Sequence, residues 1–209
     1  MATVKFTSPK GIAQYPWLTK ADTKFDAEGK FKTGLIVDVE AAQPLIDVIE
    51  KQIMATAREL VEEAAAKGKK LALDKVAAKL KRPYAEDEED DSKIVFRLSQ
   101  NQIVQGKTIS LKFFDANRKP IPLDKVPAIY GGSIIRISGG ARPYMKGANK
   151  GVTLDIYAVQ LIQLAEGTSG NDDYGFEEED GYTANHEDHG FTEEPEGFDG
   201  GADDYDEEF

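Results

Sequence analysis

The chain has 209 residues and a mass of 23.0 kDa, enough for one ordinary domain with a tail or for two small domains, and too little for a large multidomain enzyme. It contains no cysteine, which excludes disulfides, thiolate nucleophiles and zinc sites that need sulfur ligands. No segment approaches the roughly 18 consecutive apolar residues of a membrane span, and the N-terminus lacks an apolar signal core, so we expect a soluble, cytosolic protein.

The net charge of −12 is distributed unevenly along the chain. Residues 166–209 hold 18 of the 38 acidic residues and no Lys or Arg, whereas residues 1–165 hold all 26 basic residues. The body therefore carries +6 and the tail −18. The low overall isoelectric point conceals a polycationic body.

Short β-rich segments separated by turn residues predict a mainly β body. Strands are expected over residues 3–8, 31–40, 93–100, 108–115, 133–139 and 151–164. Turns are expected at Gly106, 115–117, Gly131-Gly132 and Gly139-Gly140. Phe113 shares a face with Ile109 and Leu111, so we expect its ring in the core.

A helical insertion is predicted at about residues 43–82, between the second and third strands. Apolar residues recur at three- and four-residue steps from Pro44 to Ala66: Leu45, Ile49, Ile53, Ala57, Leu60 and Ala64. Pro44 suits the first turn of a helix and Gly68 its end. A weaker pattern from Leu71 to Leu80 predicts a second short helix, and we expect the apolar stripes to pack on the sheet.

These elements predict a five-stranded Greek-key barrel of the OB type, with the inserted helix capping one end. A β-sandwich is the main alternative, because the number of strands alone does not separate the two folds. The OB-type domain is expected to span residues 1–165 and to contain an acidic, solvated loop at 86–91.

Residues 166–209 are expected to form a disordered acidic tail ending in Phe209. The segment contains no Leu, Ile, Val or Met, so it cannot bury enough apolar surface to offset the entropy of ordering its backbone. Its aromatic residues lie among acids and glycines. The tail could serve to dock partners or only to keep the protein soluble.

Enzyme motifs fail on inspection. Gly106-Lys107-Thr108 resembles the end of a phosphate-binding loop, but the first glycine of that motif is replaced by Asn101. His186 and His189, the only histidines, lie in the tail, where nothing orients them as metal ligands. The run 86–91 is read as a solvated loop, because adjacent carboxylates splay apart whereas catalytic carboxylates converge from separate elements. We therefore expect no catalytic residue, metal or cofactor.

Single-stranded nucleic acid is bound by cationic grooves with aromatic rings on which bases stack, and the body repeatedly pairs such residues. The candidate stacking residues are Tyr15, Trp17 and Tyr144. The candidate phosphate contacts are Lys10, Lys112, Arg118, Arg142, Lys146 and Lys150. Trp17 could alternatively close the barrel, whereas Tyr144, in the glycine-rich stretch 139–151, is expected to be exposed.

Tail and body have complementary charges. A tethered polyanion competes for a cationic groove at an effective concentration that can reach the millimolar range, so DNA would have to displace the tail. The freed tail could then recruit proteins through its last residues: Tyr205, Asp206, Glu207, Glu208 and Phe209.

Several segments resemble the single-stranded DNA-binding proteins of short-tailed, podovirus-type bacteriophages, and they occur in the order found in that family. The segments are 5–11, Tyr15-Pro16-Trp17, 115–127, 127–133, Arg142 to Lys146 and the acidic tail ending in Phe209. Met145 departs from the family pattern, which has Lys directly after the Tyr and an aromatic residue next. Residues 43–91 resemble the family poorly.

The resemblance implies an OB-fold protein that coats single-stranded DNA without sequence preference during phage replication, recombination and repair, and that anneals complementary strands. It also implies a homodimer in the cytoplasm of the infected bacterial host, whose tail contacts the replicative DNA polymerase and the helicase-primase. Tyr144 matches the aromatic residue of the family's Pro-Tyr loop, and Phe209 matches the terminal aromatic residue that partners recognise.

Two alternatives come from other functional classes. A Mg²⁺-dependent nuclease using residues 87–91 would cleave DNA until the metal is chelated. An acidic chaperone or nucleic-acid mimic would bind basic proteins through its tail while its body ignores DNA.

Overall fold

The computed structural model describes residues 3–24 and 26–165. Contacts between Cα atoms divide the chain into two units, Met1–Gly170 and Asn171–Phe209. All the described helices and strands belong to the first unit. The strands are β1 (Val4–Thr7), β2 (Gly11–Asp22), β3 (Lys30–Asp38), β4 (Tyr84–Glu86), β5 (Lys93–Asn101), β6 (Ile103–Val104), β7 (Lys107–Thr108), β8 (Lys112–Phe114), β9 (Pro120–Ile121), β10 (Ile134–Lys146) and β11 (Asn149–Gln163). The helices are α1 (Val39–Ala66), α2 (Leu73–Lys79) and the short 3₁₀ helix η1 (Leu123–Lys125).

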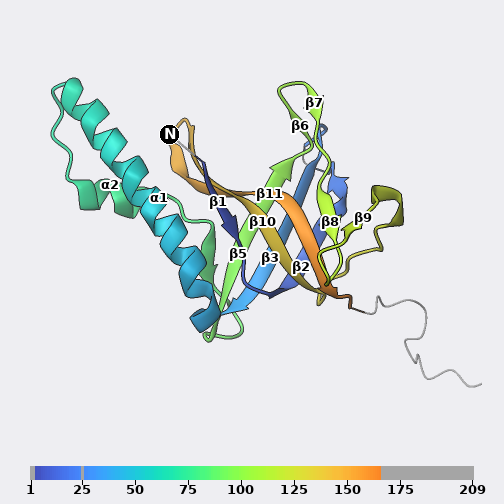
Figure 1. The fold of residues 1–209 in the computed structure, drawn as a ribbon. Coiled ribbons are helices and arrows are strands. Elements are labelled where there is room, and N and C mark those ends of the chain that lie inside the picture. Colours follow the sequence, from blue (N-terminus) through green and yellow to red (C-terminus); the bar gives the residue numbers. More distant parts are fainter. Residues whose placement is uncertain (1–2, 25, 166–209) are drawn as a thin grey trace, which may run out of the picture. The chain divides into compact units, whose positions relative to one another are not determined.

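Five strands form a closed ring in the order β2, β3, β5, β11, β10 and back to β2 (Figure 1). Four of the five pairings are antiparallel, and β5 pairs in parallel with β11, where Leu98 lies opposite Leu154. Closure of the ring distinguishes the fold from a β-sandwich. The predicted five-stranded OB-type barrel is thereby confirmed.

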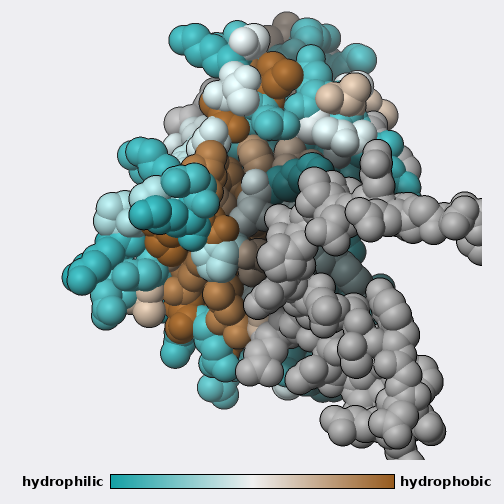
Figure 2. All heavy atoms as spheres, turned by 90° about the vertical axis from the view of Figure 1, so that its right-hand side faces the viewer, coloured by the Kyte–Doolittle hydropathy of each residue, from teal (hydrophilic) through white to brown (hydrophobic). Residues whose placement is uncertain are grey.

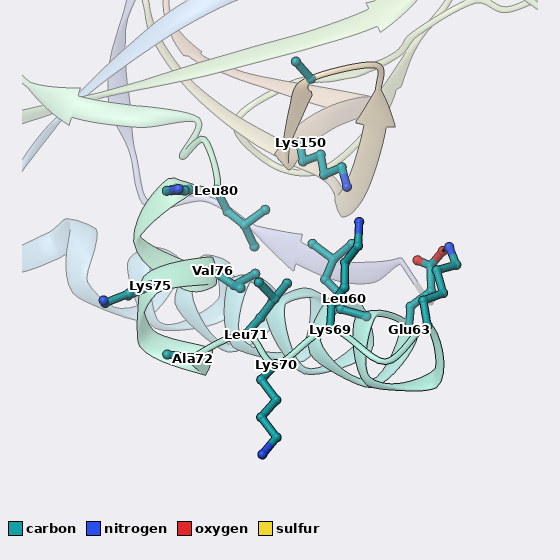
Figure 3. Close-up of a pocket in the computed structure, with 14 residues that line it drawn as sticks. Leu60, Glu63, Lys69, Lys70, Leu71, Ala72, Lys75, Val76, Leu80 and Lys150 are labelled. Atoms are coloured by element: carbon teal, nitrogen blue, oxygen red, sulfur yellow. Dashed lines mark hydrogen bonds and ion pairs between the residues drawn. The ribbon is translucent and has the colours of Figure 1, made fainter.

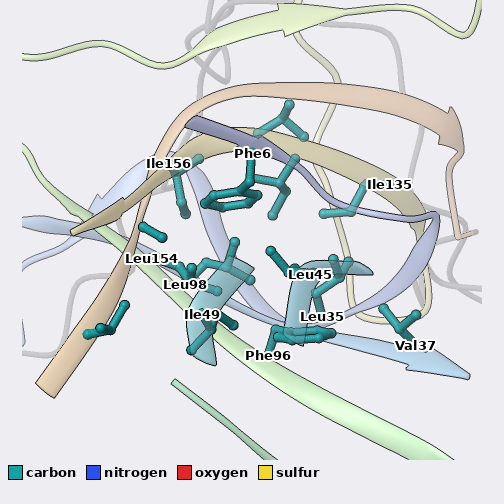
Figure 4. Close-up of a cluster of buried hydrophobic side chains, with 14 of the residues drawn as sticks. Phe6, Leu35, Val37, Leu45, Ile49, Phe96, Leu98, Ile135, Leu154 and Ile156 are labelled. Carbon is teal, nitrogen blue, oxygen red and sulfur yellow. The ribbon is translucent and has the colours of Figure 1, made fainter. Parts of the chain in front are cut away.

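The interior of the barrel is filled by every second residue of its strands and by one face of α1. In β5, Phe96 and Leu98 are buried while Arg97 between them is exposed, which is the alternation of a strand with one face in the core. Leu45 and Ile49 of α1 meet these side chains at the end of the barrel (Figure 4). The inserted helix therefore caps the barrel, as predicted, and its apolar stripe is core. Phe113 is buried, also as predicted.

The start of α1 differs from the prediction. The helix begins at Val39, directly after β3, and Pro44 lies in its second turn. The backbone N–H of Val39 donates to the carbonyl of Ser92 at 2.9 Å, so the sheet itself fixes where the helix starts. Pro44 removes only one helical hydrogen bond there. The end of the helix agrees with the prediction, because Gly68 follows it with φ of +72°.

The predicted second short helix is α2, and an ion pair ties the chain after it to α1. Arg82 donates from Nε and Nη2 to the two carboxylate oxygens of Glu50 at 2.7 and 2.8 Å, and Tyr84 Oη donates to Glu50 at 2.8 Å. Mainly because of the hydrogen bond from Arg82, the pKa of the Glu50 carboxyl lies below its ordinary value.

The barrel strand β2 is missing from the sequence prediction. Its pairing with β3 shifts register between Gln14 and Trp17, and Tyr15 has φ of +46°. This irregularity, with Pro16 inside it, breaks the alternation by which strands are recognised in a sequence. Tertiary pairing on both sides of the strand therefore decides its structure.

Two further segments differ from the prediction. The expected strand 108–115 is split, because β7 ends at Thr108 and β8 begins at Lys112. The glycine-rich stretch 139–151 is a long hairpin of β10 and β11, and its tip is at Gly147, which has φ of +58°. The expected turn at Gly139-Gly140 lies inside β10, beside a register shift between Ser138 and Gly139. A Cβ at Gly139 would collide with the carbonyl of Asp155, so glycine permits close pairing of the strands.

In the described part of the chain, no helix is long and apolar enough to cross a membrane.

Candidate nucleic-acid interface

Two aromatic rings stand on the outside of β2. Tyr15 is 80% exposed and Trp17 is 43% exposed, whereas the next residue, Leu18, is buried in the barrel. The positive φ of Tyr15 turns its side chain out of the normal alternation of the strand. Trp17 therefore does not close the barrel. Both rings are available for stacking by bases.

Lys32 is the neighbour of Trp17 on β3. Its ammonium group forms an ion pair with the nearly buried carboxylate of Asp22 at 2.5 Å, while its side chain stays 40% exposed. The hydrogen bond from Lys32, followed by that from the backbone N–H of Lys24, lowers the pKa of the Asp22 carboxyl. The ion pair holds the Lys32 ammonium group at Asp22 and compensates its charge.

The outward-facing residues of β3 and β5 continue this surface. Lys30 and Lys32 point outward from β3, since Phe31 and Thr33 between and beside them are buried. Arg97 is exposed on β5, opposite Gly34, and has no carboxylate partner among the described residues. In OB folds these two central strands form the usual face for oligonucleotides.

We call the surface formed by Tyr15, Trp17, Lys30, Lys32 and Arg97 the barrel face. Sequence analysis found its two aromatic residues but not its three cations. Arg97 could have been found from the sequence, because it lies between two core residues of a predicted strand. Lys30 and Lys32 could not, because their relation to Trp17 depends on the unpredicted strand β2.

Four other predicted site residues lie on the β10–β11 hairpin. Lys146 is exposed at its tip, and Lys150 follows on β11. Tyr144 was expected to be exposed, but it is half-buried, opposite Gly151. Arg142 donates from Nε and Nη2 to the two carboxylate oxygens of Asp155 at 2.7 and 3.0 Å. This hydrogen bonding raises the pKa of Arg142, and its charge is already compensated by Asp155.

The remaining predicted contacts lie elsewhere. Lys10 is exposed just before β2. Lys112 begins β8, which pairs with β11 beyond the point where β5 pairs with it. Arg118 is in the turn between β8 and β9 and has φ of +64°. The structure therefore places the predicted cations on three separate parts of the body. Tyr205, Asp206, Glu207, Glu208 and Phe209 lie outside the described residues.

Part of the surface is hydrophobic. Figure 2 views the side that carries β8 and β9 and shows hydrophobic side chains gathered in a strip with hydrophilic margins. The segment that follows β9 exposes Leu123 by 55% and Tyr130 by 51%. Exposed apolar area of this kind is typical of surfaces that contact other proteins.

The acidic run leads from the end of β4 to β5. Asp87 and Asp90 accept hydrogen bonds from backbone N–H groups two or three residues further on, which are the contacts of a tight surface loop. Over residues 3–24 and 26–165, no three His, Cys, Asp or Glu side chains converge to hold a metal ion. His186 and His189, which were not expected to form a metal site, lie outside the described part.

Comparison with known proteins gives consistent matches. Residues 10–164 match the family described as "Single-stranded DNA-binding protein, Bacteriophage T7". The structure resembles that of gp2.5, a single-stranded DNA-binding protein encoded by bacteriophage T7, with a TM-score of 0.67 and 27% identity over 88% of this chain and 100% of that one. No curated protein gives a significant match to the sequence.

The single-stranded DNA-binding protein of bacteriophage Enc34 shares the fold at 14% identity, with a TM-score of 0.53 over 80% of this chain and 86% of that one. Its complex with single-stranded DNA superposes with a TM-score of 0.51, again at 14% identity, over 78% of this chain and 88% of that one.

Proposed function

Because the chain belongs to the family of the single-stranded DNA-binding protein of bacteriophage T7, we propose that it coats single-stranded DNA without sequence preference during phage replication, recombination and repair. A member of this family is not an enzyme, so the nuclease alternative fails. Membership of a family of single-stranded DNA-binding proteins also argues against the chaperone or nucleic-acid mimic.

The observation that carries the proposal is the barrel face. The exposed rings of Tyr15 and Trp17 share this face with the cations Lys30 and Arg97, which lie on the strands that bind oligonucleotides in OB folds. Lys32 contributes less, because its charge is compensated by Asp22. Base stacking on aromatic rings does not depend on base identity, because every base has a π face. Such a surface suits binding that tolerates any sequence.

The predicted cations on the β10–β11 hairpin extend this site. Lys146 and Lys150 are the stronger phosphate contacts, since Arg142 is paired with Asp155. Tyr144, half-buried, is the third stacking residue. Lys10, Lys112 and Arg118 complete the set as outlying phosphate contacts.

The test is binding of a labelled oligonucleotide by fluorescence anisotropy over a range of salt concentrations. If about six phosphates are neutralised, the logarithm of affinity falls with the logarithm of salt concentration at a slope of about −4. Oligonucleotides of different sequence bind alike under this proposal. An affinity that does not change with salt contradicts it.

The acidic segment 166–209 is proposed to compete with DNA for the cationic body and to recruit partners. Its 18 carboxylates and lack of basic residues complement the positive surface, and the tether gives it a high effective concentration. Deleting the segment is expected to tighten DNA binding. Weaker or unchanged binding by the shortened chain contradicts the competition.

The partners proposed for this segment are the replicative DNA polymerase and the helicase-primase, which bind residues 205–209. The variant Phe209→Ala is expected to bind DNA as the wild type does and to lose affinity for these partners in a pull-down with purified proteins. Equal partner binding by both forms contradicts this role of the terminal ring.

Strand annealing and a homodimer in the cytoplasm of the infected host complete the proposal. The exposed side chains of Leu123 and Tyr130, in the segment that follows β9, support self-association. Analytical ultracentrifugation of the wild type and of Leu123→Glu tests the dimer. A monomeric wild type at micromolar concentration contradicts it.

A further inference from the structure

A groove of about 660 Å³ lies between the helical insertion and the tip of the β10–β11 hairpin, and we call it the helix groove (Figure 3). Its lysines are Lys67, Lys69, Lys70, Lys75, Lys79 and Lys150. Its aliphatic floor consists of Leu60, Leu71, Val76 and Leu80. In Figure 3, Lys69 and Lys150 extend into the space between α1 and the hairpin, while Lys70 and Lys75 point away.

The positive charge of the helix groove is largely uncompensated. Glu63 is the one acidic residue that lines it, and this carboxylate is paired with Lys67 at 2.6 Å. The pKa of the Glu63 carboxyl is lowered first by that hydrogen bond and further by the charge of Lys150. The other five lysines have no carboxylate partner among the described residues. Like charges gathered in one place repel, so the groove suits an anionic ligand.

The helix groove is preformed because its two walls are joined through the backbone. The N–H of Lys81 donates to the carbonyl of Lys150 at 2.9 Å, and the N–H of Val152 donates to the carbonyl of Lys81 at 3.0 Å. A Cβ at Gly151 would collide with the backbone of Lys81, so only glycine allows this contact. The chain after α2 is therefore fixed against the hairpin.

The helix groove is also connected to the barrel face through backbone hydrogen bonds. Arg97 of the barrel face donates its backbone N–H to the carbonyl of Pro83 at 2.8 Å. Two residues before Pro83, exposed Lys81 bridges to Gly151 near the tip of the hairpin. The segment from Lys81 to Pro83 thus links the backbone of Arg97 to that of Lys150.

We propose that the helix groove binds the phosphate backbone of the same DNA strand after it leaves the barrel face. This inference rests on the proposed function and adds where the strand goes. No aromatic side chain lines the helix groove, so bases do not stack there and the contact is electrostatic. The aliphatic floor gives the sugars an apolar surface.

The test compares full-length wild type with Lys69→Gln/Lys79→Gln by anisotropy, using oligonucleotides of about 8 and about 25 nucleotides, since OB folds cover about 4–16. Both lysines are exposed. Lys69 lies in the loop between α1 and α2, and at Lys79, the last residue of α2, Gln has a helix propensity close to that of Lys. The matched control is Lys51→Gln/Lys125→Gln, which removes the same charge from exposed positions outside the groove.

The expected result depends on DNA length. With the 25-mer the salt slope of the groove variant is shallower by about 1.4, two contacts at about 0.7 each, so wild-type affinity falls about sevenfold more between 50 and 200 mM salt. With the 8-mer, variant and wild type bind alike. The control variant follows the wild type at both lengths.

Equal slopes for wild type and groove variant on the 25-mer overturn the inference, as does an equal loss on both lengths. A labelled peptide of residues 196–209 identifies the competing occupant. If the groove variant loses that peptide while keeping wild-type DNA binding, the groove belongs to an acidic peptide and the inference is wrong. If the wild type binds neither oligonucleotide, the proposed function itself fails.

Discussion

Replacing Asp155 with Asn is expected to strengthen binding of single-stranded DNA. Asp155 lies on β11 with its side chain only 12% exposed, and both its oxygens accept hydrogen bonds from Arg142, whose side chain is 49% exposed. The carboxylate thus neutralises a cation that otherwise faces solvent on the hairpin. The amide of Asn has a similar shape and no charge, so it leaves the guanidinium available to a phosphate.

The magnitude follows from counterion release. One additional phosphate contact steepens the salt slope by about 0.7, so the gain in affinity is about 2.6-fold larger at 50 mM than at 200 mM salt. The assay is fluorescence anisotropy with a 25-nucleotide strand, with circular dichroism to show that the variant stays folded. The control Asp124→Asn makes the same change of charge in the exposed helix η1 and should leave the slope unchanged. A slope equal to that of the wild type, or weaker binding by a folded variant, refutes the reasoning.

Three further variants test other parts of the structure. Trp17→Ala should weaken binding about 5- to 160-fold with an unchanged salt slope, since stacking contributes about 1–3 kcal/mol per base, and Trp17→Phe should retain most of the affinity. Equal affinity of the Ala variant counts against a base on this ring. Gly151→Ala should lower the midpoint of thermal unfolding by at least about 2 °C, because the added methyl group collides with Lys81 and overpacking costs about 1–3 kcal/mol. The control is Gly131→Ala, where the methyl group has room, and equal midpoints for the two variants refute the collision. Because the pKa of Glu50 is lowered in the folded state, this carboxylate stabilises the protein above about pH 4.3, and the contribution is lost as the pH falls through the folded-state pKa. The free energy of urea unfolding of Glu50→Gln should therefore change less between pH 5 and pH 3 than that of the wild type, and parallel pH profiles for variant and wild type contradict this.

Regular periodicity made much of the fold predictable. The stripe of α1, including Leu45 and Ile49, and the alternation around Phe96 report burial directly, because each side chain faces the core at a fixed step. Strand β2 has no such signal. Its bulge between Gln14 and Trp17 interrupts the period, and only the strands on either side hold it in the sheet.

The candidate site could be predicted where neighbouring residues in the sequence already combine the required side chains. Tyr15 and Trp17 are aromatic residues between lysines, and the structure exposes both. The role of Arg142 could not be read in this way, since its partner Asp155 is 13 residues away and comes close only through the hairpin. Cations of the helix groove are likewise brought to Lys150 by a contact at Lys81 that no local pattern indicates.

Fluorescence titration of Trp17, the only tryptophan, with a single strand of about 30 nucleotides at two salt concentrations tests most directly whether the barrel face binds DNA. Stacking of a base on the exposed indole predicts quenching that saturates, with a midpoint that moves to higher DNA concentration at higher salt. An unchanged emission together with no shift of the DNA in a native gel would contradict binding of single-stranded DNA by this protein.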